Sequence, residues 1–242
     1  MGDVQQSSSE QSQVKIIRSR LTTSEEITEM LLREVVLARH SPRVFLPKPV
    51  PRVLLEESLE LARHAPSDSN TQMWRLWIVR GDAMEPFRQE LFTVASNDPG
   101  VKYADLPADY TPYRMRLAKK VYGDGFGVSR GKQRDIVLLN YKFFDAPVAI
   151  IVCMSKEWEG EAALSVGMYL QTLMLALAER GVATIAQAAI VRYPDVVKKH
   201  LGIPDDMKVL LGMSVGYEDP NASANQVEIE REPYSVTTTF VE

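Results

Sequence analysis

The sequence contains little cysteine and little histidine. Its 242 residues include one cysteine, Cys153, and three histidines. A single cysteine excludes an intramolecular disulfide framework and fits a reducing compartment. The histidines His40, His64 and His200 stand far apart and show no spacing typical of metal ligands. The sequence therefore predicts neither a disulfide-rich secreted domain nor a metal centre.

The sequence also lacks a large excess of charge of either sign, and it lacks long apolar runs. Lys and Arg number 28 against 32 Asp and Glu, a balance that argues against a dedicated nucleic-acid binder. The longest apolar run, residues 146–154, is too short to span a bilayer, and the polar residues 1–13 are no secretory signal. We expect a cytoplasmic protein that binds neither nucleic acid nor membrane. Residues 1–13 are predicted to be a disordered tail before one domain, 14–242.

Helices and strands can be placed from the spacing of apolar residues. Hydrophobic residues make up 45% of the chain, which is enough for an ordinary globular core. Helical spacing and capping signals, beginning with a capping box at Thr23–Glu26, predict helices over residues 23–38, 51–62, 161–180 and 194–201. Short apolar runs predict strands over residues 76–79, 148–154, 183–187, 209–217 and 236–241. Scattered strands after initial helices indicate α+β architecture.

The predicted helix 161–180 is apolar on nearly all sides. Leu170, Leu173 and Leu177 lie on one stripe, while Met168 and Leu175 cover other sides. A helix without a polar face is buried, either in the core or at a subunit interface.

The segment from Lys102 to Arg134 differs from its surroundings. Its eight basic and three acidic residues give it a net charge of +5 in an acidic chain, and five aromatic residues lie among them. We expect a long irregular, lid-like insertion that binds a ligand, since such segments are often lids. A solvated surface excursion is the equally open alternative.

The chain shows no catalytic constellation of its own. It has no nucleophile elbow, and Gly123–Gly127 lacks the strand and the spacing of a dinucleotide fingerprint. Cys153 stands inside an apolar strand. Such a chain is a candidate to take its chemistry from a cofactor. Two polar loops could serve one: the guanidinium groups and hydroxyl of 39–43 suit a phosphate, and the amides of 66–72 suit a heterocycle.

Several short motifs, in this order, resemble the FMN-dependent nitroreductase family. The resemblance runs over nearly the whole chain, from Ile27 to Val241. The motifs are Arg-x-Ser-x-Arg at 39–43, Ala-Pro-Ser-x-x-Asn-x-Gln-x-Trp at 65–74, the stretch 181–189, Leu-Gly-Ile-Pro at 201–204, Gly-Met-Ser-Val-Gly-Tyr at 212–217 and Arg-Glu-Pro at 231–233. Within the family, residues 144–147 and 187–189 are similar to the branch that reduces nitrobenzoates.

The resemblance implies a fold and a cofactor site. The family fold is a three-layer α+β sandwich around a mostly antiparallel sheet, built as an intertwined homodimer with FMN at the subunit interface. The phosphate and ribityl chain would be held by Arg39, His40, Ser41, Arg43 and Arg231. The isoalloxazine would be lined from the other subunit by Pro66, Ser67, Ser69 and Asn70, and its N5 edge approached by Gln187, Ala188 and Ala189. The helix 161–180 would form the dimer.

The resemblance also implies an activity. NADH or NADPH would reduce FMN, and a small nitroaromatic substrate such as a nitrobenzoate would then take its place and be reduced to a hydroxylamine, in a ping-pong cycle. The candidates for substrate contacts lie in the basic segment: Arg114, Arg116, Tyr122, Phe126 and Arg130. The alternatives are a flavin-dependent quinone, azo or enone reductase, a non-catalytic flavin redox sensor, and an aromatic-binding module without flavin.

Overall fold

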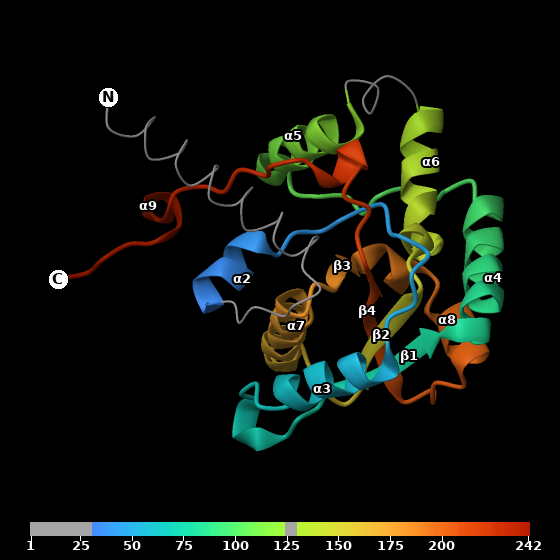
Figure 1. Cartoon of the computed structure of the whole chain (residues 1–242), viewed down its shortest axis with the longest axis horizontal. Helices are drawn as coiled ribbons and strands as arrows, with labels where there is room; N and C mark the ends of the chain where they lie inside the picture. The colour runs from blue at the N-terminus through green and yellow to red at the C-terminus, as the bar shows by residue number, and fades with distance from the viewer. Residues whose placement is uncertain (1–30, 124–129) are drawn as a thin grey trace.

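The computed structural model describes residues 31–123 and 130–242 (Figure 1). Three expectations fall outside the described residues: the tail 1–13, the capping box at Thr23 and the aromatic Phe126. The helix expected over 23–38 is described only in its last part, α2 (Leu32–Ala38).

The centre of the molecule is a four-stranded antiparallel sheet in the order β1-β2-β4-β3. Its strands are β1 (Arg75–Arg80), β2 (Val148–Ser155), β3 (Ala183–Gln187) and β4 (Met207–Gly216). The first four predicted strands are thereby confirmed. Side chains of a strand alternate between faces, and in β2 both sets are buried: Ile150 joins the core on one face and Ile151 the core on the other. The sheet is therefore covered on both sides.

Two helices cover the first face, α3 (Arg52–Ala62) and α7 (Ala162–Glu179). By length and composition α7 could span a membrane, but half of it is buried inside the protein. Leu173 and Leu177 are 1% and 0% exposed and belong to this core, so this stripe of the helix is buried within the protomer. The outward apolar side chains of α7 are instead Leu164 and Met168, which are 70% and 42% exposed.

Three helices cover the other face: α4 (Met84–Asn97), α6 (Arg130–Tyr141) and α8 (Pro194–Leu201). The predicted helix 194–201 is confirmed, and Gly202 ends it with a left-handed φ of 62°. No helix was predicted for α4, although Phe87, Leu91 and Ala95 are buried at a spacing of four residues. The helical layers on both faces make the expected three-layer α+β sandwich.

Much of the described part of the segment 102–134 is helical, whereas an irregular segment was expected. It forms α5 (Thr111–Tyr122) and enters α6. Pro112 is compatible with the first turn of α5, and Ala118 and Val121 give the helix a narrow buried stripe. The many charged residues of this helix obscure its short apolar pattern in the sequence, so the helix was not predicted.

The C-terminal strand expected over 236–241 is absent from the described chain. Tyr234–Thr237 form a short helix, α9, and the following residues are exposed. Figure 1 shows this end extending away from the body. A strand exists only beside another strand, and the tail has no such neighbour in one protomer. Short 3-10 helices make further connections: η1 (Asp68–Asn70), η2 (Gly81–Ala83), η3 (Ala108–Tyr110), η5 (Phe143–Asp145), η6 (Ala188–Arg192) and η7 (Ser223–Asn225).

Candidate functional site

A cavity of about 760 Å³ lies between α2, α5, α7 and the C-terminal segment 224–231. Five of the residues assigned above to the cofactor phosphate line it, although they come from opposite ends of the chain. They are Arg39, His40, Ser41, Arg43 and Arg231. The concentration of guanidinium groups and a hydroxyl in one cavity is suited to a phosphate, which needs several fixed donors.

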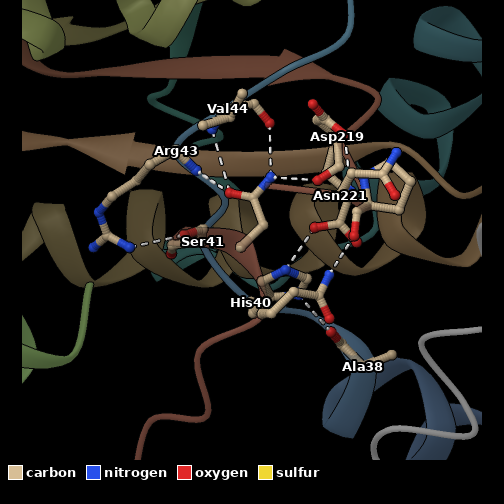
Figure 2. A network of polar contacts seen from close by, with 11 residues as sticks. Ala38, His40, Ser41, Arg43, Val44, Asp219 and Asn221 are labelled. Atoms are coloured by element: carbon tan, nitrogen blue, oxygen red, sulfur yellow. Dashed lines mark hydrogen bonds and ion pairs between the residues drawn. The ribbon is translucent and has the colours of Figure 1, made fainter. Parts of the chain in front are cut away.

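The backbone of the arginine loop is fixed by Asn225, a residue that the sequence analysis missed. Its Oδ1 accepts hydrogen bonds from the backbone N–H groups of Arg43 (2.8 Å) and Val44 (3.3 Å). Its Nδ2 donates to the carbonyl oxygens of Val44 (2.8 Å) and Asp219 (3.0 Å). Figure 2 shows Arg43, Val44 and Asp219 around this network. Asn225 is buried, and nothing in the polar turn 221–225 marks it out in the sequence.

The side chain of Arg43 connects the loop to α5. Its Nη1 donates to the Ser41 carbonyl at 3.1 Å. The guanidinium carbon lies 5.7 Å from the ring centroid of Tyr122, the last residue of α5. A cation over an aromatic face is stabilised by the ring quadrupole. The predicted substrate residue Tyr122 is thus brought to the predicted phosphate loop.

Both ring nitrogens of His40 have protein partners. Nδ1 lies 3.0 Å from the Ala38 carbonyl oxygen (Figure 2), and Nε2 lies 2.6 Å from Oε2 of Glu218. The His40 and Glu218 side chains are 16% and 15% exposed. The ring therefore lies between the Ala38 carbonyl and the Glu218 carboxylate that follows β4, and His40 also lines the cavity.

The basic side chains of α5 are engaged by the acidic C-terminal segment. Lys120 Nζ lies 2.6 Å from Glu230 Oε1, and Arg116 Nη2 lies 3.4 Å from Glu232 Oε1. Arg114 donates instead to the Ala104 carbonyl oxygen at 2.6 Å. Lys120 lines the cavity, whereas Arg114 and Arg116 do not. The side chain of Arg130 lies outside the described part of the chain.

The second predicted loop, Pro66–Asn70, does not line this cavity. Figure 1 shows it beyond the end of α3, at the edge of the molecule away from α5. Ser165 of α7 accepts a hydrogen bond there from the backbone N–H of Asp68 at 3.2 Å. Ser69, Asn70 and Gln72 have φ angles of 48°, 57° and 47°. Left-handed conformations at non-glycine residues concentrate at functional sites, so the backbone of this loop is unusual whatever it binds.

The residues expected at the flavin N5 edge lie where β3 runs into η6. Gln187 is buried, and its Nε2 donates to the Asn140 carbonyl oxygen at 2.8 Å, while its Oε1 lies 2.6 Å from Ser214 Oγ. Its side chain is therefore structural. Ala188 is exposed and Ala189 half-buried, so both residues are accessible to a ligand.

Two buried ionisable side chains, Cys153 and Tyr169, are protonated at neutral pH. Burial raises the pKa of the Cys153 thiol to about 11, and it raises the pKa of Tyr169 to about 12. A thiol in this state is a poor nucleophile. Within residues 31–123 and 130–242, no group of three or more His, Cys, Asp and Glu side chains is arranged to hold a metal ion.

Comparison with known proteins gives one consistent answer. The model of the Nitroreductase family matches residues 36–217. The chain is 36% identical to 4-nitrobenzoate reductase of Pseudomonas putida, over 86% of this chain and 94% of that protein. It is 32% identical to nitrobenzene nitroreductase of Ectopseudomonas oleovorans, over 88% and 98%. The solved FMN-dependent nitroreductase NfnB of Mycobacterium smegmatis, in complex with NADPH, superimposes with a TM-score of 0.78 at 31% identity, over 87% and 97%. The chain, with its nitroreductase-like α+β fold, belongs to the nitroreductase family.

Proposed function

We propose that this protein is an FMN-dependent oxidoreductase that uses NADH or NADPH to reduce small nitroaromatic compounds, nitrobenzoates among them. The observation that carries the proposal is the cavity that brings Arg39, Ser41, Arg43 and Arg231 together. The nitro-compound reductases among its relatives and the NADPH complex of a similar structure support the same activity.

The residues of the cavity fit the phosphate end of FMN. Arg39, Arg43 and Arg231 supply positive charge, and Ser41 supplies a hydroxyl donor. Asn225 fixes the backbone of the loop through hydrogen bonds within the protein, which keeps the free-energy cost of ordering the loop on binding small. FMN, when bound, supplies the redox chemistry between the nicotinamide and the nitro group. A backbone N–H of the accessible residues Ala188 and Ala189 would orient the reacting edge by hydrogen bonding.

The arrangement also favours a homodimer. Pro66–Asn70 lies away from the arginine cavity within one protomer (Figure 1), so one flavin can touch both only if a second copy supplies one of them. The outward face of α7 exposes Leu164 and Met168, and β3 forms one edge of the sheet. An apolar helix face and an open strand edge are surfaces that a second copy would cover.

A single spectroscopic experiment tests the proposed activity. The purified protein is expected to carry flavin absorption that NADPH or NADH bleaches anaerobically and that 4-nitrobenzoate restores. A protein without visible absorption would be an aromatic-binding module. A flavin that neither nicotinamide bleaches would indicate a redox sensor. Restoration by quinones, azo compounds or enones, but not by the nitro compound, would assign the rival reductase activity.

We further propose that the basic segment selects acidic nitroaromatics, with α5 as part of a lid. Of the two candidate arginines whose side chains the structure describes, Arg116 is the more available to bind a substrate carboxylate, because its ion pair with Glu232 is exposed and long. Arg116→Gln is expected to lower kcat/KM for 4-nitrobenzoate, relative to nitrobenzene, about tenfold. Arg114→Gln, which removes a guanidinium bound to a carbonyl, should leave the ratio near the wild-type value. An unchanged ratio in Arg114, Arg116 and Arg130 variants alike would contradict carboxylate recognition by this segment.

A further inference from the structure

The η6 segment follows β3, and its C-terminal end is hydrogen-bonded to an acidic residue of another loop. Asp98 comes directly after α4 and accepts hydrogen bonds through Oδ2 from Arg192 Nε (3.0 Å), Arg192 Nη2 (2.9 Å) and Tyr193 Oη (2.8 Å). Arg192 is the last residue of η6, and Tyr193 follows it. Three donors on one carboxylate oxygen define the position of the end of η6.

The Asp98 loop is itself shaped to make this contact. The Gly100 N–H donates to Asp98 Oδ1 at 2.7 Å, and the Gly100 carbonyl oxygen accepts from Arg192 Nη2 at 2.9 Å. A Cβ at Gly100 would lie 3.1 Å from Asp98 Oδ1 and 3.3 Å from Arg192 Nη2. Arg134 of α6 donates to the Asp98 carbonyl oxygen at 2.9 Å. The loop is therefore tied to α6 as well as to η6.

The middle of η6 is fixed by packing. Ile190 is buried, and a Cβ at Gly212 of β4 would lie 2.6 Å from its Cγ1. The Tyr193 ring lies 5.2 Å from that of the buried Tyr141, centroid to centroid. At the other end, Gln187 is hydrogen-bonded to the Asn140 carbonyl oxygen. The η6 segment is therefore fixed at both ends, and in its middle by the packing of Ile190. Ala188 and Ala189, exposed and half-buried, are then the accessible residues next to Gln187.

We propose that Asp98 is a positioning residue that, through Arg192 and Tyr193, sets the place of the Ala188–Ala189 backbone against the reacting edge of the flavin. The inference rests on the proposed function, because it needs a flavin at this edge. Asp98 lies outside the cofactor motifs of the sequence and takes no part in the chemistry itself. Hydrogen bonds from Tyr193 and then from Arg192 hold the pKa of Asp98 below its usual value, so the carboxylate is ionised at neutral pH.

The test combines a conservative pair of variants with a matched control. Asp98→Asn removes the charge, and Tyr193→Phe removes a single hydroxyl while the ring stays against Tyr141. Asp105→Asn, in the same loop but exposed and paired with Lys102, controls for the loss of one acidic charge. The measurements on the FMN-loaded proteins are the midpoint potential of the flavin, the rate of its reduction by NADPH, and amide hydrogen exchange over residues 187–193.

Asp98→Asn and Tyr193→Phe are expected to keep FMN, to make its midpoint potential more negative and to speed exchange over 187–193. Loss of alignment should slow reduction by NADPH at least about tenfold, while Asp105→Asn remains like the wild type. The inference is overturned if both variants keep the wild-type potential and exchange, or if Asp105→Asn shifts them equally. If Asp98→Asn does not fold, Tyr193→Phe alone decides. A wild-type protein without reducible flavin would instead overturn the proposed function.

Discussion

Replacing Arg43 with alanine is expected to weaken FMN binding at least about tenfold. A hydrogen bond to a charged group contributes about 1.5–3 kcal/mol, and about 1.4 kcal/mol corresponds to a factor of ten in the dissociation constant. The substitution leaves the loop backbone bonded to Asn225, since that contact uses the main chain. The loss should therefore reflect the guanidinium and not a collapsed loop.

Two comparisons separate the phosphate contact from the other roles of Arg43. Tyr122→Leu removes the aromatic partner of the guanidinium and should weaken FMN binding less than Arg43→Ala does. Arg52→Ala deletes a cation from α3, where Arg52 is exposed and paired with Glu56, and should leave binding unchanged. Titration of apoprotein with FMN, followed by quenching of flavin fluorescence, gives each dissociation constant. Wild-type affinity in Arg43→Ala would refute the phosphate assignment.

The sequence predicted those helices and strands whose apolar spacing and end signals lie within the element itself. The strand β3 and the helix α8 follow from an apolar run and from a helix closed by Gly202, and both were placed correctly. The helix α5 was missed because its buried stripe is narrow and its charges dominate the composition. The terminal strand was placed where β-branched residues favour one, but a strand also needs a neighbour, which one protomer does not supply.

Some residues of the candidate site were likewise predictable from the sequence, and others were not. The motif Arg-x-Ser-x-Arg and the remote Arg231 were named from their resemblance to a family, and they line one cavity. Asn225 and Asp98 could not be found, because a buried amide and a loop carboxylate look like ordinary turn residues until their partners are known. His40 was assigned to the cofactor by its place in the motif; it lines the same cavity, and its Nε2 also lies 2.6 Å from Glu218 Oε2, a neighbour that the sequence does not indicate.

The proposed homodimer is expected to depend on the outward face of α7. Met168→Glu changes a side chain that is 42% exposed in the protomer, so the stability of the protomer should change by no more than about 0.5 kcal/mol. In a dimer that buries this face, an unpaired carboxylate costs several kcal/mol, which weakens association at least about a hundredfold. The variant should be a folded monomer that loses its flavin.

Two controls distinguish an interface effect from misfolding. Leu173→Glu buries a charge in the core of the protomer, where Leu173 is 1% exposed, and should abolish folding as seen by circular dichroism. Leu106→Glu adds a carboxylate at a similarly exposed leucine in the loop before α5 and should leave a flavin-loaded dimer. Light scattering after size-exclusion chromatography reports the mass of each. A flavin-loaded Met168→Glu dimer would refute the role of this face.

Mixed dimers test whether each flavin is shared between two subunits. Asn70→Asp keeps a residue that tolerates the left-handed φ of 57° at this position, but places an anion where the flavin ring would lie. If the arginine loop and Pro66–Asn70 of one site come from different copies, a dimer of an Arg43→Ala subunit and an Asn70→Asp subunit contains one intact site. Co-expression with two affinity tags, followed by purification on both, should therefore recover one flavin site of wild-type affinity per dimer, whereas both sites of each parent homodimer bind flavin weakly. If both loops of a site came from the same copy, the mixed dimer would contain two damaged sites and remain as poor in flavin as its parents.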